Sequence, residues 1–453
     1  MAIDGIKVRS GSAEIVGRIV GVPALTQGQV GCWMNVPYAQ APVGPLRFAA
    51  PRPLPPSSRG TGPAQVDARA ALPIVAPQLP SRLQDVLGGF AGLPQEDCLR
   101  LHIWAPLAAL EDGQPRPVLV WLHGGAWISG GGGLAWYDGG AWAREAGVVV
   151  VGVNYRLGAL GWLAADAPED NNLGLQDSQM ALQWIARHIG AFGGDPGRVT
   201  LMGQSAGADN VGALMLDARP LPFQQAIVQS APLGRELRTL DEARAVRRIG
   251  MRQWGVEDLE QLRHLPLPAL LEGQANALVM AQMKAAGIEG QVYTVVADGL
   301  HVPVQGREHY LQAAGKIPSI VGATAEEMTA FPGMRRVPED LAIGRRLFNA
   351  GAEQWQLQAQ AAGQKCWRYE FQYGPNPRYG ACHCIELPFS FGTLAAFAHA
   401  PMLAGGDAAH MQALSLQWRG SLQSFVTRGD PLWEQGEEGL HRVGGQPAVD
   451  EHF

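Results

Sequence analysis

Apolar residues in this chain follow two patterns. Short apolar runs, continuous or alternating and rich in β-branched residues, predict strands, whereas apolar residues spaced three or four apart predict helices. The predicted strands cover residues 15–22, 31–36, 99–104, 118–122, 148–153, 199–202, 225–229, 317–321 and 367–373. The predicted helices of this pattern cover residues 174–189 and 415–427. Strands and helices alternate through the middle of the chain, which is typical of a mostly parallel sheet with helices on both faces.

The remaining segments predict what surrounds this sheet. Residues 42–56 contain repeated prolines, which exclude a regular helix or a central strand, so the first 95 residues are expected to wrap around the main body. Residues 235–290 and 332–365 are predicted to be helical cap or flanking segments. No Gly/Ser-rich linker or internal repeat divides the chain, and we expect one α/β domain spanning residues 1–453.

One strand-to-helix junction carries a chemical motif. The strand at 199–202 runs into Gly203-Gln204-Ser205-Ala206-Gly207, and helix-compatible residues follow. The pattern G-x-S-x-G at such a junction is the nucleophile elbow, in which a sharp turn exposes the serine above a sheet. The pentapeptide is short, and a chain with 58 glycines can contain it by chance. Its interpretation therefore depends on the context.

A second loop supplies that context. His123-Gly124-Gly125-Ala126 directly follows the buried strand at 118–122. The α/β-hydrolase fold has an oxyanion loop of this kind before the elbow. Both loops follow the carboxyl ends of predicted strands, where parallel sheets place their active sites. The two matches together predict an α/β-hydrolase with Ser205 as nucleophile. Trp127 is a candidate for the acyl pocket, with ordinary core packing as an equal alternative.

An elbow serine needs a histidine base and a carboxylate, in the chain order Ser, Asp/Glu, His. Among the histidines after Ser205, His383 follows a predicted strand and is the first candidate, and His399 is the second. The candidates for the acid are Glu326 and Glu327, which follow the strand at 317–321, and Asp298, whose Asp-Gly sequence is more typical of a turn. The pattern alone leaves this choice open.

Seven segments together resemble the type-B carboxylesterases, the family of the bacterial p-nitrobenzyl esterases and the cholinesterases. They are VPYAQAPVGPLRF at 36–48, EDCLRLHIW at 96–104, HGGAWISG at 123–130, NYRLGALGWL at 154–163, NNLGLQDSQMALQWIARHIGAFGGDPGRVTLMGQSAGA at 171–208, GATAEEMTAF at 322–331 and GACHCIELPFSFG at 380–392. The resemblance covers most of the chain. It implies the α/β-hydrolase fold and ester hydrolysis through an acyl-enzyme, without a cofactor.

The resemblance also implies roles for individual residues. By position in the family motifs, the triad falls on Ser205, Glu327 and His383, and the oxyanion donors fall on the backbone N–H groups of Gly125, Ala126 and Ala206. One position departs from the family, because Gln204 stands where a glutamate usually precedes the serine. In the family that glutamate lies near the histidine and a second glutamate, which matches Glu386. Gln204 lacks the charge that would favour the imidazolium, so we expect a shifted pH optimum.

Composition and charge exclude several other classes of protein. The net charge of −6 is spread without long like-charge runs, which gives no indication of a nucleic-acid surface. No apolar run is long enough to span a bilayer, and the first residues lack the pattern of a secretory signal. The five cysteines match no zinc template, since Cys382-His383-Cys384 has no second cluster to complete a site. We expect a cytoplasmic protein with reduced thiols, no metal and no cofactor, and a small-molecule ester as its partner. A monomer is the working expectation.

Two other functions remain open from the sequence. The same triad could act on carbamates or amides, which sequence does not separate from esters. The fold could also serve a non-catalytic binding protein, since fold does not determine function. Such relatives typically lack the serine or the histidine, whereas this chain has both.

Overall fold

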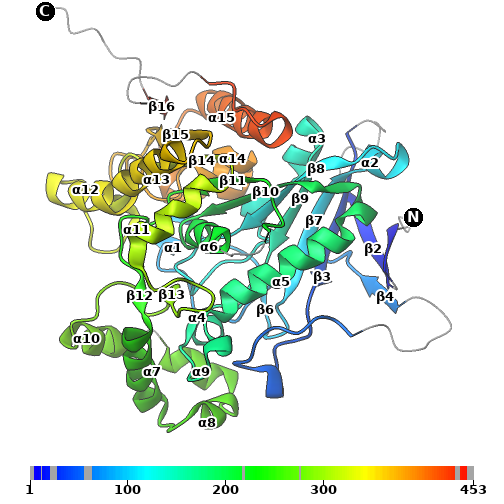
Figure 1. Cartoon of the computed structure of the whole chain (residues 1–453). Coiled ribbons are helices and arrows are strands. Elements are labelled where there is room, and N and C mark those ends of the chain that lie inside the picture. The colour runs from blue at the N-terminus through cyan, green and yellow to red at the C-terminus, as the bar shows by residue number, and fades with distance from the viewer. Residues whose placement is uncertain are drawn as a thin grey trace, which may run out of the picture.

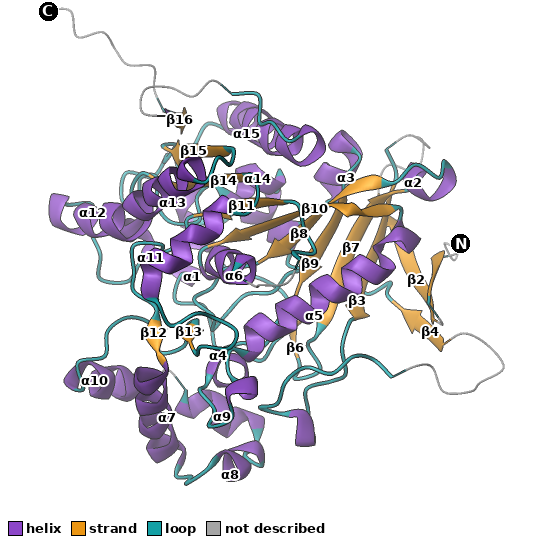
Figure 2. Cartoon of the chain, viewed as in Figure 1, coloured by secondary structure: helices purple, strands orange, loops and turns teal. Residues whose placement is uncertain are grey.

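The apolar runs of the sequence pair into one long twisted sheet, which crosses the molecule in Figures 1 and 2. The computed structural model describes residues 5–11, 13–20, 28–55, 64–216, 220–274, 277–433 and 439–445. Within these ranges the sheet has 12 strands. They are β1 (Ile6–Ser10), β2 (Ala13–Val20), β3 (Val30–Pro37), β4 (Ala64–Asp67), β7 (Arg100–Pro106), β8 (Arg116–Leu122), β9 (Val149–Val153), β10 (Gly194–Gln204), β11 (Gln225–Gln229), β14 (Ser319–Thr324), β15 (Cys366–Phe371) and β16 (Leu440–Val443).

The order of the strands is β1-β2-β3-β7-β9-β8-β10-β11-β14-β15-β16, and β4 pairs with β2. Every neighbouring pair from β9 to β16 is parallel, whereas β1, β2, β3, β7 and β9 pair antiparallel in turn. The predicted mostly parallel sheet is thus confirmed. Each predicted strand corresponds to a strand of this sheet, although residues 21–22 of the first lie outside the described residues, as does residue 56 of the proline-rich segment.

Two small two-stranded sheets and the helices complete the architecture. In one small sheet β5 (Ile74–Val75) pairs with β6 (Leu93–Pro94), and in the other β12 (Arg238–Thr239) pairs with β13 (Val296–Ala297). The α-helices are α1 (Gln84–Leu87), α2 (Ala108–Glu111), α3 (Gly140–Ala146), α4 (Gly158–Trp162), α5 (Leu173–His188), α6 (Ala206–Met215), α7 (Leu240–Trp254), α8 (Leu259–Arg263), α9 (Leu267–Gly273), α10 (Ala277–Ala285), α11 (Gly306–Leu311), α12 (Pro338–Gly344), α13 (Ala350–Ala361), α14 (Leu387–Phe391) and α15 (Ala408–Arg428). No helix among the described residues is both long and apolar enough to cross a membrane.

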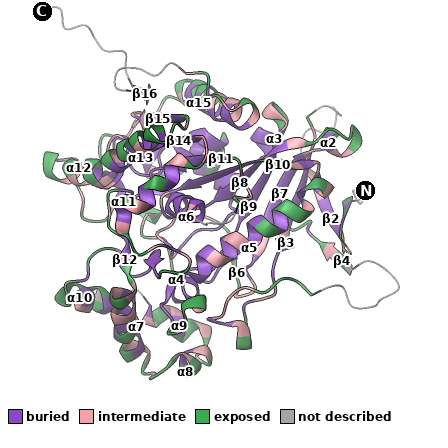
Figure 3. Ribbon diagram, viewed as in Figure 1, coloured by how far each residue is buried: buried purple, intermediate pink, exposed green. Residues whose placement is uncertain are grey.

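The central strands are buried because helices cover both faces of the sheet. Residues 118–122 of β8 are fully buried. Val120 packs into an apolar core with residues of α5 and α6, whereas its neighbour Trp121 packs into a second core with residues of α3 and α15. Figure 3 shows this arrangement as buried residues along the sheet and on the helix sides that face it. A strand covered on both faces needs the continuous apolar sequence seen here.

The two predicted flanking segments are helical. Residues 235–290 contain α7 to α10, which form a separate cluster beside one end of the sheet in Figure 1. Residues 275–276 of this segment lie outside the described residues. Helix α7 begins with a capping box between Thr239 and Glu242, which satisfies two backbone N–H groups at once. Residues 332–365 contain α12 and α13, joined by one π-helical turn at Arg345–Asn349.

Candidate active site

Ser205 occupies a strained turn between β10 and α6. Its backbone has φ 56° and ψ −123°, a conformation that non-glycine residues rarely adopt. Two hydrogen bonds hold this turn: Ser205 N–H donates to Gln229 O at 2.9 Å, and Asp209 N–H donates to Ser205 O at 3.0 Å. Strain of this kind persists only where the surroundings fix it, and it is typical of functional sites.

The two glycines of the elbow are required by close packing. A Cβ atom on Gly203 would lie 2.4 Å from Gly207 O, and one on Gly207 would lie 2.1 Å from Leu122 O. Both distances are far below a normal contact, so any other residue would push β10, α6 and β8 apart. The motif G-x-S-x-G is thus a packing requirement that turns Ser205 away from the sheet.

His383 and Glu327 lie together beside this turn, although 56 positions separate them in the chain. His383 Nδ1 is hydrogen-bonded to Glu327 Oε2, and Glu327 Oε1 accepts the Thr324 N–H at 2.8 Å. Both residues are 1% exposed. Phe331 and Phe348 pack against the imidazole, each with a ring-centroid distance of 5.2 Å. The carboxylate and the aromatic rings fix the position of the imidazole, and His383 and Ser205 line the same cleft.

The other candidates for base and acid are placed elsewhere. Glu326 forms an ion pair with Arg336 at 2.7 Å and accepts the Ala381 N–H at 2.9 Å. His399 is exposed to solvent. The structure therefore brings Glu327, rather than its neighbour Glu326, to the imidazole of His383.

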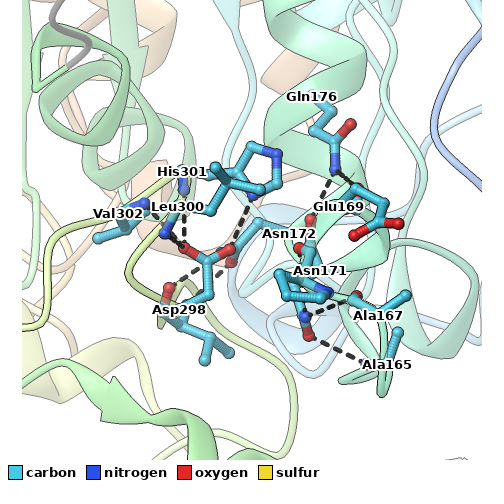
Figure 4. A network of polar contacts seen from close by, with 12 residues as sticks. Ala165, Ala167, Glu169, Asn171, Asn172, Gln176, Asp298, Leu300, His301 and Val302 are labelled. Atoms are coloured by element: carbon cyan, nitrogen blue, oxygen red, sulfur yellow. Dashed lines mark hydrogen bonds and ion pairs between the residues drawn. The ribbon is translucent and has the colours of Figure 1, made fainter.

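Asp298, the third candidate for the acid, organises a loop (Figure 4). Its Oδ1 accepts the backbone N–H groups of Leu300, His301 and Val302 at 2.8–3.0 Å. Its Oδ2 lies 2.8 Å from both His301 Nδ1 and Asn172 Nδ2. Burial acts to raise the pKa of Asp298, but these hydrogen bonds outweigh burial and lower it. Asp298 is thus a turn residue, as its Asp-Gly sequence indicated.

The loop after β8 presents two backbone N–H groups to the cleft. Gly125 and Ala126 both line the cleft, and within the described residues neither N–H has a hydrogen-bond acceptor. Gly125 has φ 114°, and a Cβ atom there would lie 2.0 Å from Ser129 O, so only glycine fits. Ala206 is the first residue of α6, where an N–H has no acceptor within its own helix. These three amides are available to a negatively charged oxygen.

His123 supports this loop from behind. Its ring stacks on Tyr155 at a centroid distance of 4.5 Å, and its Nδ1 lies 2.7 Å from Gly124 O. Burial lowers the pKa of His123 to about 4. The imidazole is therefore neutral at physiological pH and serves as a packing element.

The cleft above Ser205 contains about 610 Å³ of space between protein atoms, some of it open to solvent. Its lining combines the elbow, the β8 loop and an apolar wall from the N-terminal segment. The residues are Ser81, Arg82, Leu83, Leu87, Phe90, Gly124, Gly125, Ala126, Ile128, Ser129, Gly130, Trp136, Tyr137, Gln204, Ser205, Phe331, His383 and Cys384.

Trp127 does not line this cleft, which corrects the suggestion that it contributes to an acyl pocket. Its backbone has φ 60°, and its side chain is buried at 1% exposure. The indole N–H donates to Asn210 Oδ1 at 2.9 Å, and the Arg235 guanidinium lies over the ring at 5.4 Å. The positive φ turns Trp127 into the interior beside α6, so the core-packing alternative describes its position.

Gln204 contacts the imidazole on the side opposite Glu327. Its Nε2 lies 3.3 Å from His383 Nε2 and 3.3 Å from Cys384 Sγ. Within the described residues the Ser205 hydroxyl has no hydrogen-bond partner. Catalytic hydrogen bonds are often incomplete without substrate and tighten when it binds.

Two buried groups near this site have shifted pKa values. Burial acts to lower the pKa of His383, but Cys384 and the Glu327 carboxylate outweigh burial and raise the pKa well above its ordinary value. Burial and the nearby Glu327 charge raise the pKa of Glu386 to about 7, and its Oε1 accepts the Ser230 hydroxyl at 2.8 Å. The surroundings of the imidazole therefore shift both groups toward their protonated forms relative to their ordinary pKa values.

The apolar wall of the cleft was not predicted from the sequence. Leu83, Leu87 and Phe90 come from the N-terminal segment, which was expected only to wrap around the main body. Arg82 precedes them and is a further cleft residue that was missed. The segment has one short helix, α1, and no chemical motif, so no pattern in the sequence could identify it. Within the described residues, no group of three or more His, Cys, Asp or Glu side chains could hold a metal ion.

Comparison with known proteins agrees with this architecture. The model of the carboxylesterase family matches residues 5–341. A probable N-octanoylanthranilate hydrolase of Rhodococcus erythropolis is 36% identical over 432 residues, covering 90% of this chain and 91% of that protein. The para-nitrobenzyl esterase of Bacillus subtilis (strain 168) is 31% identical over 415 residues, covering 82% of this chain and 81% of that protein.

Solved structures give the same result. A PNB esterase structure superimposes with a TM-score of 0.78 at 27% identity, covering 95% of this chain and 92% of the other. The Geobacillus stearothermophilus carboxylesterase has a TM-score of 0.75 at 29% identity, covering 96% and 93%. The predicted resemblance and the α/β-hydrolase fold are both confirmed, and the chain belongs to the carboxylesterase family of carboxylic ester hydrolases.

Proposed function

We propose that Ser205 is the nucleophile of this hydrolase, with His383 as its base and Glu327 as the acid that orients the base. His383 takes the Ser205 proton as the oxygen attacks the substrate carbonyl, and Glu327 stabilises the imidazolium that forms. The alcohol leaves with the proton that His383 returns. Water then attacks the acyl-enzyme by the same route and restores Ser205.

The backbone N–H groups of Gly125, Ala126 and Ala206 are proposed to stabilise the oxyanion. Donors fixed before the reaction need no reorganisation, and each is worth about 3–4 kcal/mol in comparable sites. The N–H groups of Gly125 and Ala126, which have no acceptor within the described residues, and the helix N-terminus at Ala206 support this role. The reaction needs no metal and no cofactor.

One observation carries this proposal. The strained Ser205 turn and the hydrogen-bonded pair of His383 and Glu327 come from three separate parts of the chain and meet at one cleft. A binding protein has no need of this combination, because a strained serine and a buried carboxylate–imidazole pair both cost stability.

Amides are the second class of substrate for the same site. The Rhodococcus relative, at 36% identity, is named for an octanoyl group on nitrogen. The triad chemistry is the same for an ester and an amide, apart from the poorer leaving group of the amide. We therefore propose ester hydrolysis as the main activity, with hydrolysis of activated N-acyl substrates as an alternative.

We propose a cytoplasmic monomer that folds as one domain, with residues 235–290 and 332–365 as helical cap or flanking segments. All five cysteines are buried and none forms a disulfide within the described residues, which fits a reducing compartment.

Hydrolysis of p-nitrophenyl esters of increasing acyl length, by wild type and Ser205→Ala, tests this function. We expect the substitution to lower kcat by about 1,000-fold or more, since removal of a triad serine has effects of this size or larger. Ser421→Ala on α15, outside the cleft, is the matched control and should retain full activity. If wild type hydrolyses none of these esters and none of the matching anilides, and so does not differ from Ser205→Ala, the result would favour a binding protein instead.

A further inference from the structure

Among the described residues that line the cleft above Ser205, Arg82 is the one permanently charged side chain. No Asp or Glu is among the described residues that line the cleft. The wall beside Arg82 is apolar, with Leu83, Leu87 and Phe90 following it in the chain. A cation that faces a substrate cleft without an acidic neighbour has its charge available to a ligand.

The contacts of Arg82 orient its guanidinium without neutralising it. Its Nη2 donates to the side-chain carbonyl Oε1 of Gln291 at 2.7 Å. Arg238 in turn holds the Gln291 backbone, donating to Gln291 O at 2.7 Å and to Glu289 O at 2.8 Å. Within the described residues, Arg82 forms no ion pair. The remaining N–H donors of the fork therefore have no protein acceptor there.

Arg82 keeps its positive charge beside the apolar wall. Arg82 is exposed to solvent, and local desolvation beside the apolar wall lowers its pKa. An arginine remains protonated at physiological pH even so. Because the side chain is exposed, salt screens its charge, and its attraction for a bound carboxylate should fall as salt rises.

We propose that Arg82 binds a carboxylate group of the substrate, so that the preferred substrates combine an apolar portion with a carboxylate near the scissile bond. The planar fork of arginine matches the two oxygens of a carboxylate. The apolar wall receives the hydrocarbon portion, while Ser205 attacks the ester or amide carbonyl. This inference rests on the proposed function, because it assigns the substrate of the same site.

Matched pairs of esters test this assignment and identify which side of the scissile bond carries the carboxylate. p-Nitrophenyl butyrate is compared with mono-p-nitrophenyl succinate, which places the charge on the acyl side. Phenyl octanoate is compared with 4-(octanoyloxy)benzoate, which places it on the leaving group. Values of kcat and KM are measured for wild type, Arg82→Gln, Arg82→Lys and Arg187→Gln at low and high salt. Arg187 is an exposed control on α5.

We expect Arg82→Gln to lower kcat/KM for at least one carboxylate ester by about 10-fold, mainly through KM, as for loss of a charged hydrogen bond. The matching neutral ester should change less than about 3-fold, within the usual effect of an exposed substitution. Arg82→Lys should retain part of the preference for the carboxylate ester over the neutral ester. Arg187→Gln should retain all of this preference. Added salt should weaken the preference in wild type.

A purely structural role for Arg82 would give a different result. If Arg82 only ties the N-terminal segment to Gln291, then Arg82→Gln and Gln291→Met should impair neutral and carboxylate esters alike, and this outcome would overturn the inference. Under the inference, Gln291→Met keeps most of the carboxylate preference because the charge remains. If wild type hydrolyses the neutral esters and Arg82→Gln leaves kcat/KM for both carboxylate esters unchanged, the inference is refuted and the proposed function stands. Inactivity on all four esters and on the matching anilides would refute the proposed function as well.

Discussion

Gln204 separates this site from the usual pattern of type-B carboxylesterases, in which a glutamate precedes the serine. Its Nε2 lies 3.3 Å from Nε2 of His383, on the side of the ring that faces away from Glu327. An amide N–H donates only to an unprotonated ring nitrogen, so Gln204 favours the neutral imidazole. A general base must be neutral to accept the serine proton. Gln204 thus opposes the influence of Glu327 on the charge of His383.

Gln204→Glu should move the acid limb of the rate profile to higher pH. A carboxylate at this position accepts the Nε2 proton and favours the imidazolium, which raises the pKa of His383 further above its ordinary value. Because activity is lost as pH falls through this pKa, the variant should lose activity at a higher pH than wild type. The measurement is kcat/KM for p-nitrophenyl butyrate from pH 5 to pH 9.

The control for this experiment is Gln204→Met, which changes the contact without adding charge. It should lower the rate with a smaller displacement of the acid limb. Superimposable profiles for wild type and Gln204→Glu would show that position 204 does not act on the charge of the imidazole.

Three other residues show which features of the site can be predicted from the sequence and which cannot. Position in the family motif selected Glu327 over Glu326, and the structure places only Glu327 at His383. The direction of Trp127 could not be read from sequence, because it depends on a positive φ in a loop. Arg82 was missed because its contact, Gln291, lies more than 200 positions away in the chain.

At the scale of elements, the Asp298 loop joins the start of α5 to the segment after β13. Asn172 at the start of α5 has φ 51° and exchanges hydrogen bonds with Val296, donating at 2.9 Å and accepting at 2.9 Å. The same side chain donates to Asp298 at 2.8 Å. One buried carboxylate thus links two elements that flank the helical cluster.

Asp298→Ala should destabilise the protein by about 3–5 kcal/mol, the usual cost of removing one partner from a buried charged network. The substitution leaves the backbone N–H groups of Leu300, His301 and Val302 without their acceptor. Urea unfolding followed by circular dichroism measures the change. Under folding conditions, kcat for a short ester should remain close to that of wild type, because Asp298 does not contact His383.

Asp430→Ala provides the matched control. Asp430 is exposed and accepts a single backbone N–H, from Leu432 at 2.8 Å. Its loss should cost about 1 kcal/mol or less. If both variants unfold at the same urea concentration, the Asp298 network contributes nothing to stability.

The elements themselves were largely predictable because their burial imposes a simple pattern. A strand covered on both faces must be apolar throughout, and β8 and β9 are examples of such runs. Helix α15 was predicted to start at residue 415 but begins at Ala408, after Asp407 caps it by accepting the His410 N–H at 2.8 Å. The first turns of α15 are largely exposed and contain alanines and few large apolar residues, so the apolar period did not extend to them.

At the scale of the whole molecule, the site depends on contacts between distant segments. The N-terminal segment supplies the apolar wall, the centre supplies the elbow and the β8 loop, and the C-terminal third supplies Glu327 and His383. The order of the parallel strands brings these parts to one edge of the sheet, as expected for the carboxyl ends of such strands. Pattern alone predicted the sheet and the elbow, whereas the family resemblance was needed to assign the acid. The cleft wall required the structure.

Covalent labelling of the nucleophile tests the account most directly. Wild type and Ser205→Ala are treated with a fluorophosphonate, and the residual esterase activity, the intact mass and the modified peptide are determined. We predict one label per chain on Ser205, loss of activity in proportion to labelling, and no labelling of the variant. Inactivation with the label on another residue, such as Cys384 in the same cleft, or wild-type hydrolysis by Ser205→Ala, would contradict the assignment of Ser205 as the nucleophile.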